Sequence, residues 1–332
     1  MTQAALDVLC LGNAIVDVIA TTDDAFLVRH GLAKGSMALI DEARAEALYE
    51  AMGPATIVSG GSAANTAVGI ASLGARAGFV GKIRDDAVGA HFAHDLRATG
   101  VAFATPVATD GPATARSFIL VTPDGERTMN TYLGACQGLS AADVDPEQVR
   151  GAGVVYLEGY LWDPPAAKEA FRQAVAIAHA AGRQVALTLS DAFCVDRYRD
   201  EFLGLIRDGS LDILFANTHE LRSLYGTADE DAAVAALREE GVLGVVTRSE
   251  RGALVVSRGA TRAVDAFPVE RVVDTTGAGD LFAAGFLAGL ARGLDHATCA
   301  RLGGLAAAEV ISHIGARPQA SLSDLARENG LV

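Results

Sequence analysis

Short apolar segments alternate with longer helix-like segments over most of this 332-residue chain. The alternation is clearest after Asp143, where the strand-like runs 154–158, 184–189 and 213–216 are each followed by a helical stretch. Strands separated by helices of roughly ten or more residues pair in parallel, because each helix returns the chain along the sheet. We therefore predict an α/β fold with a parallel sheet and helices on both faces.

One hairpin interrupts this alternation. Residues 114–122 and 126–132 are strand-like and are joined by Pro123-Asp124-Gly125, a short loop that contains glycine. With the extended runs 15–20 and 36–40, the hairpin would form a small separate sheet. We expect one domain over residues 1–332. Its small sheet would span about 14–40 and 114–132, and its core about 6–13, 41–113 and 133–332.

Composition narrows the possible functions. Hydrophobic residues make up 50% of the chain, charged residues 20%, and 41 acidic against 27 basic residues give a net charge of −14. This balance disfavours nucleic acid and anionic membranes as partners. No apolar run reaches the ~18–20 residues of a membrane span, and Met1–Asp7 lacks a secretory pattern. Four dispersed cysteines without a CxxC pair indicate reduced core residues, so we expect a cytoplasmic protein.

The stretch from Val273 to Phe282 has the pattern of an anion site. Its sequence passes from an apolar run through Thr-Thr-Gly-Ala-Gly-Asp into an apolar, helix-like segment. Gly277 and Gly279 leave backbone N–H groups uncovered, and the start of a helix presents unpaired N–H groups and the positive end of its dipole. Asp280, at the mouth of this pocket, would be either a helix-stabilising charge or a general base.

Three motifs resemble those of the PfkB/ribokinase family of sugar and nucleoside kinases. They are Asp-Thr-Thr-Gly-Ala-Gly-Asp at 274–280, Gly-Gly-Ser-Ala-Ala-Asn at 60–65, and Gly-Asn-Ala-Ile-Val-Asp at 12–17. The last two look closest to the adenosine-kinase-like branch. The resemblance extends from Leu6 to about Pro318. It implies a ribokinase-like three-layer core, in which the small sheet is a lid over the substrate, and an ATP-dependent phosphoryl transfer.

The resemblance also implies roles for individual residues. Asp280 would take the proton from a primary hydroxyl, while the backbone of Gly277, Ala278 and Gly279 stabilises charge on the transferring group. Asp17 interrupts an apolar strand, where it would either face water at a sheet edge or grip substrate hydroxyls; the resemblance favours the second. The substrate-binding residues implied or inferred are Asn13, Asp17, Gly60, Gly61, Asn65 and Phe118.

ATP and Mg²⁺ are the implied cofactors. Asn217-Thr218-His219-Glu220 matches the Asn-x-x-Glu motif of the family, in which Asn217 and Glu220 would hold waters around Mg²⁺; the alternative is a helix capping box. The phosphate contacts implied or expected come from Thr247, Gly252, Thr276 and Gly279. Ser249 departs from the usual glycine near these phosphates, as Arg84 does in another family stretch. We add, as a hypothesis, a K⁺ site at Asp274 beside the loop 315–318.

The substrate is narrowed but not fixed by the sequence. Ser62 and Thr66 stand where ribokinases commonly have Lys and Gln, which argues against ribose. We favour adenosine or a related nucleoside, phosphorylated at the 5′-hydroxyl by a monomer or homodimer. The alternatives are a free-sugar kinase of the fructose, ribose or 2-keto-3-deoxygluconate type, and a sensor without catalysis. Purine contacts are expected from Met37, Leu39 and Phe118, and further lid contacts from Arg116, Arg127 and Tyr132.

Overall fold

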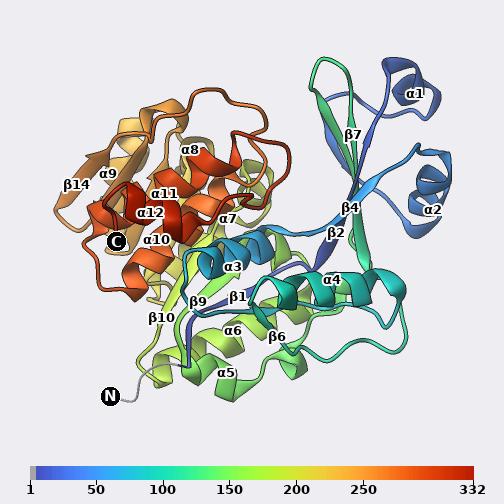
Figure 1. Cartoon of the computed structure of the whole chain (residues 1–332). Coiled ribbons are helices and arrows are strands. Elements are labelled where there is room, and N and C mark those ends of the chain that lie inside the picture. Colours follow the sequence, from blue (N-terminus) through green and yellow to red (C-terminus); the bar gives the residue numbers. More distant parts are fainter. Residues whose placement is uncertain (1–4) are drawn as a thin grey trace.

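Two β-sheets organise the structure, a computed structural model that describes residues 5–332 (Figure 1). The strands of the large sheet are β1 (Leu6–Leu11), β5 (Ala77–Val80), β6 (Ala102–Phe103), β9 (Ala152–Glu158), β10 (Gln184–Thr188), β11 (Ile213–Asn217), β12 (Leu243–Thr247), β13 (Ala253–Ser257) and β14 (Ala260–Val264). Their order is β14-β13-β12-β11-β10-β9-β1-β5-β6. All pairs are parallel except β12–β13 and β13–β14, which form an antiparallel edge.

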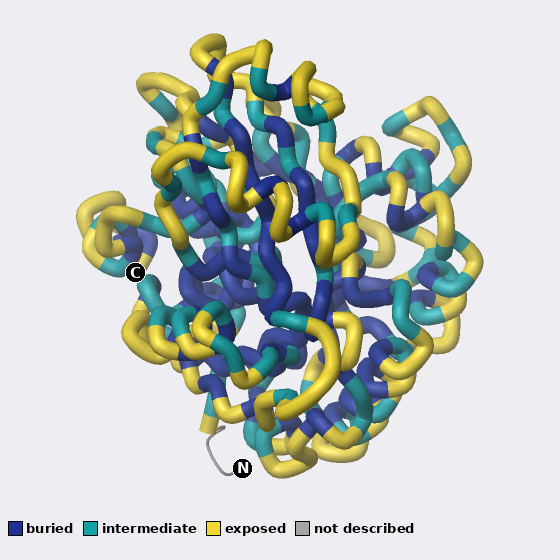
Figure 2. The backbone as a smooth tube through the Cα atoms, turned by 90° about the vertical axis from the view of Figure 1, so that its right-hand side faces the viewer, coloured by how far each residue is buried: buried dark blue, intermediate teal, exposed yellow. Residues whose placement is uncertain are grey.

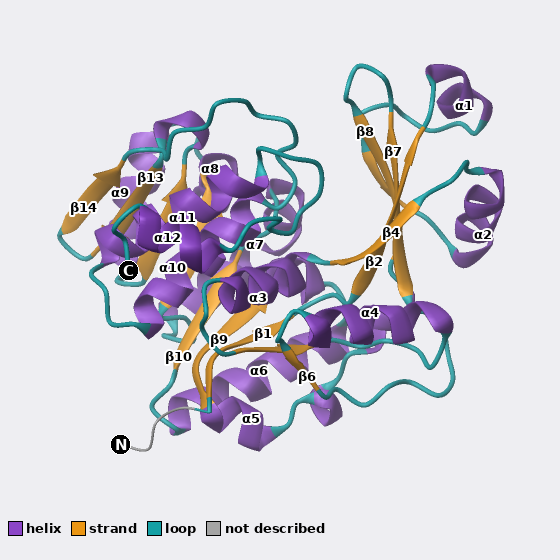
Figure 3. Ribbon diagram, in the orientation of Figure 1, coloured by secondary structure: helices purple, strands orange, loops and turns teal. Residues whose placement is uncertain are grey.

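Helices cover both faces of the large sheet (Figure 3). They are α3 (Ser62–Ser72), α4 (Ala87–Ala98), α5 (Pro146–Gly151), α6 (Pro165–Ala180), α7 (Ala192–Arg207), α8 (Thr218–Tyr225), α9 (Glu230–Glu240), α10 (Ala278–Ala291), α11 (His296–Val310) and α12 (Leu322–Glu328). One apolar core joins the sheet to α3, α4 and α10–α12, and a second joins it to α5–α9. The predicted three-layer architecture is therefore confirmed.

The small sheet projects from the core as a lid. Its strands are β2 (Ile15–Thr21), β3 (Met37–Leu39), β4 (Thr56–Gly60), β7 (Ala115–Val121) and β8 (Arg127–Tyr132), in the order β3-β8-β7-β2-β4. The expected hairpin is β7–β8, with antiparallel pairs such as Phe118–Asn130. Helices α1 (Asp24–Arg29) and α2 (Glu42–Ala51) pack against one face of the lid, and the other face lies over the core.

The lid is larger than the sequence suggested. Residues 41–60 were assigned to the core, but α2 and β4 belong to the lid. Ala45 and Leu48 of α2 are buried in the lid's own apolar cluster, and β4 pairs antiparallel with β2. An amphipathic helix and a short strand have the same local pattern in either sheet, so only the strand pairing assigns them.

Two helix boundaries follow from local structure. Helix α7 begins at Ala192, because Asp191 caps it by accepting a hydrogen bond from the Cys194 amide at 2.6 Å. Tyr198 is a kink within this helix. Helix α11 ends at Val310.

Burial follows the layers, with buried strands inside and exposed loops outside (Figure 2).

Within residues 5–332, none of the helices combines the length and apolar character needed to span a bilayer. The expectation about a secretory segment at Met1–Asp7 concerns in part residues 1–4, which lie outside the described residues. All four cysteines are buried and unpaired, as expected.

Candidate active site

A cavity of about 860 Å³ lies between the lid and the core. Its core side is built at the carboxyl ends of neighbouring strands, where Glu158, Thr188, Asn217 and Thr247 follow one another across the sheet. Loops beyond the carboxyl ends of parallel strands are the usual ligand sites of open α/β sheets. The cavity also contains Asp280, so the motifs that are far apart in sequence meet in one place.

Asp280 is held by two side chains of α3. Its Oδ1 accepts a hydrogen bond from Ser62 Oγ at 2.6 Å, and its Oδ2 accepts one from Asn65 Nδ2 at 3.1 Å. Thr66 Oγ1 donates to the Asp280 backbone carbonyl at 3.2 Å. The two residues that depart from the ribokinase pattern, Ser62 and Thr66, therefore both contact Asp280. Burial raises the pKa of Asp280, although these hydrogen bonds oppose that rise. A raised carboxylate pKa suits a general base.

The start of α10 forms the expected anion pocket. Gly277 caps the helix with φ +79°, and a Cβ atom there would lie 2.8 Å from Ala316. The expectation for Ala278 is corrected, because its amide donates to the Thr275 carbonyl at 3.2 Å. The amides of Gly279 and Asp280 remain as the first-turn donors at the cavity. Gly279 is exposed, so a phosphate can approach its backbone closely.

Asp17 lies on the cavity face of β2 and directly against β4. A Cβ atom at Gly60 would fall 2.3 Å from Asp17 Oδ2, so glycine at this position makes room for the carboxylate. No side chain of the described residues donates a hydrogen bond to Asp17, and burial raises its pKa to about 7. A buried carboxylate without a protein donor is suited to bind hydroxyl groups of a substrate.

Glu158 is a site residue that the sequence analysis missed. It is 1% exposed, and it accepts hydrogen bonds from Asn13 Nδ2 at 2.8 Å and from the Ala63 amide at 2.8 Å. Burial raises its pKa to about 7. Glu158 thus orients Asn13 and the start of α3 beside Gly61. The signal that could have found it was an acid at the end of a buried strand.

Asn217 and Glu220 form a capping box and also line the cavity. Asn217 Oδ1 accepts from the Glu220 amide at 2.9 Å, and Glu220 Oε2 accepts from the Asn217 amide at 2.9 Å. Burial raises the pKa of Glu220 to about 7. No cluster of three or more metal-ligating residues exists among residues 5–332. One carboxylate and one amide fit a Mg²⁺ ion that keeps its waters and is held mainly by phosphates.

Asp274 has no lone pair left for a cation. Its Oδ1 accepts from the Thr276 amide at 3.0 Å and from Thr276 Oγ1 at 2.7 Å. Its Oδ2 accepts from the Gly315 amide at 2.9 Å and from the Arg127 guanidinium. Burial opposes ionisation of Asp274, but these donors together lower its pKa. A carboxylate has about four acceptor sites. These four donors argue against the hypothesis of K⁺ at this side chain, because Arg127 of the lid already supplies a positive charge.

Four of the lid residues expected to contact substrate do not line the cavity, and one of them, Arg127, pairs with Asp274 instead. Side chains alternate along a strand, and on β7 it is Ser117 and Ile119 that face the cavity. Phe118, expected to bind substrate, is fully buried between the sheet and α2. Arg116 points the same way and pairs with Glu46, and Tyr132 lies in the same apolar cluster.

Only some of the residues predicted to contact the nucleotide line the cavity. Thr247 and Thr276 line the cavity, but Gly252 does not. Gly252 adopts φ +77°, and a Cβ atom there would meet the Val264 carbonyl at 2.1 Å, so packing alone accounts for this glycine. Ser249 adopts φ +53°, the left-handed conformation that glycine takes without strain.

The lid side of the cavity is mainly apolar. Six apolar side chains line it: Ile15, Met37, Leu39, Ile119, Met129 and Leu133. Met37 and Leu39 were expected here. Phe193 of α7, which the sequence analysis did not single out, also lines the cavity and is 64% exposed.

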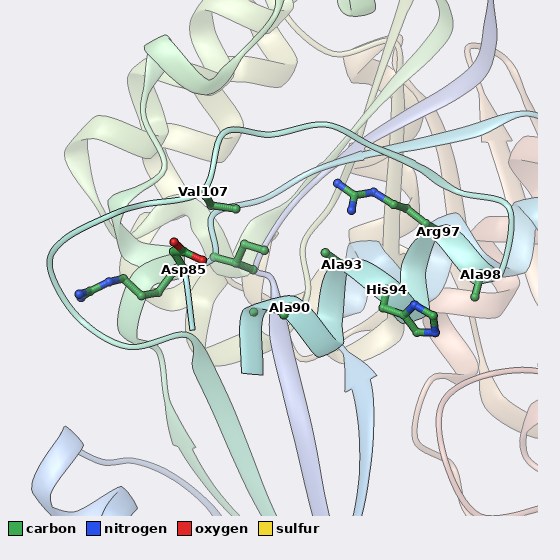
Figure 4. Close-up of a pocket in the computed structure, with 10 residues that line it drawn as sticks. Asp85, Ala90, Ala93, His94, Arg97, Ala98 and Val107 are labelled. Carbon is green, nitrogen blue, oxygen red and sulfur yellow. The ribbon is translucent and has the colours of Figure 1, made fainter. Parts of the chain in front are cut away.

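A smaller cavity of about 540 Å³ lies beside α4, away from this site (Figure 4). The side chains of Arg97 and His94 point in different directions there. Arg97 is already bonded to the Phe103 carbonyl. The polar side chains that line this smaller cavity therefore do not converge on one point, as they would in a binding site.

Known proteins share both the sequence and this arrangement. A family model described as pfkB family carbohydrate kinase matches residues 6–322. An adenosine kinase from Sinorhizobium meliloti is 55% identical, with 98% of this chain and 100% of that chain covered and a TM-score of 0.92. A probable sugar kinase from Rhizobium etli CFN 42 is 51% identical, with 99% and 100% covered and a TM-score of 0.94.

A more distant relative has a different acceptor. The ATP-dependent ribose-1-phosphate kinase of Halopiger xanaduensis is 32% identical over 252 residues, 74% of this chain and 79% of that protein. Kinases of this kind use ATP, usually with Mg²⁺, and transfer phosphate to an alcohol. The chain belongs to the pfkB family of carbohydrate kinases and is a phosphotransferase for a small sugar or nucleoside.

Proposed function

We propose that this protein phosphorylates the 5′-hydroxyl of adenosine or a closely related nucleoside with ATP. The observation that carries the proposal is the apolar lid face. A free sugar presents hydroxyls on all sides, whereas the base of a nucleoside needs an apolar surface. Met37 and Leu39 are 47% and 56% exposed at the cavity, and large apolar side chains so exposed mark a binding surface.

Phe193 supports the same choice of substrate. Its exposed ring lies on α7, outside the lid, and it also lines the cavity. Arg197 lies over the ring at 4.4 Å from its centroid. An aromatic face with an arginine beside it suits stacking on a planar base. The 55% identity with an adenosine kinase of the same length points in the same direction.

The proposed reaction uses the carboxylates according to their surroundings. Asp17 binds the ribose hydroxyls, and Asn13 and Asn65 complete the sugar site. Asp280 accepts the proton of the 5′-hydroxyl as its oxygen forms a bond to the γ-phosphorus of ATP. The bond from this phosphorus to the β,γ-bridging oxygen breaks, and ADP leaves with that electron pair. The Gly279 and Asp280 amides stabilise charge on the transferring group.

Mg²⁺ would be held through water by Asn217 and Glu220, next to the phosphates. When bound it neutralises charge on the β- and γ-phosphate oxygens. The lid residues exclude water from the transferring group, which limits ATP hydrolysis. Asp274, tied to the lid by Arg127, links the lid to the loop that precedes the anion pocket.

A free-sugar kinase is the second candidate, because Asp17, Asn13 and Asn65 would bind any vicinal diol. A coupled ADP-release assay with Mg²⁺ separates the candidates, using a panel of nucleosides, ribose, fructose and 2-keto-3-deoxygluconate. We expect turnover on adenosine, with a 5′-monophosphate identified by ³¹P NMR, and none with Asp280→Asn. Turnover on a free sugar alone would refute the nucleoside proposal and leave the kinase assignment intact. Silence on the whole panel would favour the sensor.

A further inference from the structure

Arg317 connects three parts of the site that are distant in sequence. It lies in the loop after α11, where its Nε donates to Asn65 Oδ1 at 3.3 Å and its Nη1 donates to Ser59 Oγ at 2.6 Å. Its Nη2 is buried and has no hydrogen-bond partner within the described part of the chain. Ser59 belongs to lid strand β4 and pairs with Val16, next to Asp17 on β2. One guanidinium thus bridges the lid, α3 and the C-terminal loop.

The contact with Asn65 fixes the orientation of its amide group. A guanidinium only donates hydrogen bonds, so it can bind the Oδ1 end of Asn65 but not the Nδ2 end. The Nδ2 end is then turned toward Asp280, where it donates to Oδ2 at 3.1 Å. With the amide reversed, Oδ1 would face a carboxylate oxygen, and Nδ2 would face a cation.

We propose that Arg317 is a positioning residue for phosphoryl transfer, which orients Asn65 toward Asp280 and places a positive charge beside Asp17. This inference rests on the roles given above to Asp280 and Asp17. The cavity lining does not include Arg317, and the sequence analysis gave this residue no role of its own. It acts on the reaction only through these neighbours.

The charges around Asp17 agree with this role. Three charged groups influence the pKa of Asp17: Arg317 of the C-terminal loop and Arg127 of β8 lower it, and Asp280 of α10 raises it. Burial raises the pKa of Asp17 to about 7, and Arg317 is the stronger of the two cations that oppose this rise. Burial also lowers the pKa of Arg317 to about 10, so it is still protonated at neutral pH.

The remaining charged neighbours are acids and one histidine. Glu158 faces Asp280 from β9. Asp95 of α4 faces Arg317, accepts a hydrogen bond from Ser59 at 3.2 Å and lies 3.2 Å from His91. Without Arg317, Asp17 would keep only Arg127 as a nearby cation, and its carboxyl would resist ionisation more strongly.

The test compares the pH dependence of kcat/KM for the wild type with Arg317→Met, Arg317→Lys and Arg317→Gln, using adenosine. For Arg317→Met we expect a loss of about 10²-fold at pH 7, because misplacing a catalytic group costs that much. The acid limb is the pH range over which kcat/KM falls as the solution becomes more acidic. In Arg317→Met it should move upward by about one pH unit, the usual effect of one nearby charge. Arg317→Lys retains the charge and should keep the wild-type acid limb, while Arg317→Gln should show the shifted one.

Arg97→Met is the matched control. Arg97 donates through Nε and Nη2 to the Phe103 carbonyl at 3.1 and 3.0 Å, and it lies outside the active site. We expect an unchanged acid limb and an unchanged kcat/KM for this variant. Thermal melting shows which variants are folded. If Arg317→Met is not folded, the comparison of Arg317→Lys with Arg317→Gln provides the test.

Two results would be decisive against the inference. A folded Arg317→Met with kcat/KM within twofold of wild type would show that the residue is only structural. Identical acid limbs for Arg317→Lys and Arg317→Gln would exclude the role of its charge. If the wild type does not phosphorylate adenosine, the proposed substrate is wrong, and the same comparison is made on the sugar that it accepts.

Discussion

The two ends of the cavity are built differently. At the phosphoryl-transfer end, Asp280, Asp274 and Glu220 already have hydrogen-bond donors within the protein. At the lid end, Met37 and Leu39 are half exposed and can be covered only by a ligand or by movement of the lid. Catalysis is preorganised, because its groups are held before substrate binds. In the proposed nucleoside complex, recognition of the base would depend on apolar area that is still exposed to water.

This difference predicts separate kinetic effects. Substitutions at the first end should lower kcat, since they remove interactions made in the transition state. Substitutions at the lid end should raise KM for the nucleoside, since they remove binding of the base. The predictions below test this division, from the largest expected effect to the smallest.

Asp280→Asn should lower kcat by about 10²–10⁴-fold, the usual contribution of a general base. Asparagine keeps the size of the side chain and an oxygen that can accept from Ser62, so the melting temperature should change little. Steady-state kinetics with adenosine measure the effect. Asp295→Asn makes the same chemical change at the exposed cap of α11 and should leave kcat unchanged. Near-wild-type turnover by Asp280→Asn would contradict the assignment of the base.

Glu220→Gln should raise the Mg²⁺ concentration needed for half-maximal rate by about 10–100-fold, as is typical for residues that orient metal-bound groups. The amide removes a negative charge and one acceptor from the cavity wall. A Mg²⁺ titration at fixed ATP measures the change. Glu230→Gln makes the same chemical change on α9, where it breaks an ion pair with Arg251, and it is the control. An unchanged Mg²⁺ requirement would reduce Glu220 to its capping role.

Leu39→Ser should raise KM for adenosine by about tenfold and leave kcat within about threefold, because about 1–2 kcal/mol of apolar contact with the base is lost. Val28→Ser is the control, since Val28 is also an exposed apolar residue of the lid but lies outside the cavity. A tenfold fall in kcat for Leu39→Ser would show that binding of the base and phosphoryl transfer are not separable. An unchanged KM for adenosine would remove the support for a base-binding lid.

The acid limb of kcat/KM should lie near pH 7 and not near pH 4. The reaction needs ionised Asp17 and Asp280, and burial raises the pKa of both, that of Asp17 to about 7. Activity therefore falls as the pH drops through that region, by about tenfold per unit when one group titrates. Initial rates from pH 5 to 9 measure this limb. If kcat/KM does not change between pH 9 and pH 5, these carboxylates ionise normally and the prediction is wrong.

Replacing K⁺ by tetramethylammonium should change the rate by less than about twofold, because four donors already fill the acceptor sites of Asp274. Arg127→Ala frees one of these sites, and a K⁺ dependence is expected only in that variant. A strong K⁺ requirement of the wild type would show that Arg127 leaves Asp274 during turnover.

Much of the site was predictable because its motifs are local. The glycines around Ala278 and the acid at Asp280 lie within four consecutive residues at the start of α10, so one short motif contains them all. Asn217 and Glu220 lie one helical turn apart, and one short motif likewise contains both. Phe118 was assigned to the wrong face of β7. Both faces of this strand are largely buried, so the sequence pattern does not show which face lines the cavity.

The sequence by itself determined the α/β fold, the hairpin and the glycine-rich helix start that carries the acid Asp280, since periodicity and glycine spacing act over short distances. Only the tertiary structure decided which residues support that acid. Ser62 reaches Asp280 across 218 residues of sequence, and Arg317 reaches Asn65 across 252. Such contacts depend on how strands and helices pack, and a hydroxyl or a guanidinium has the same local pattern whether it faces solvent or a buried carboxylate.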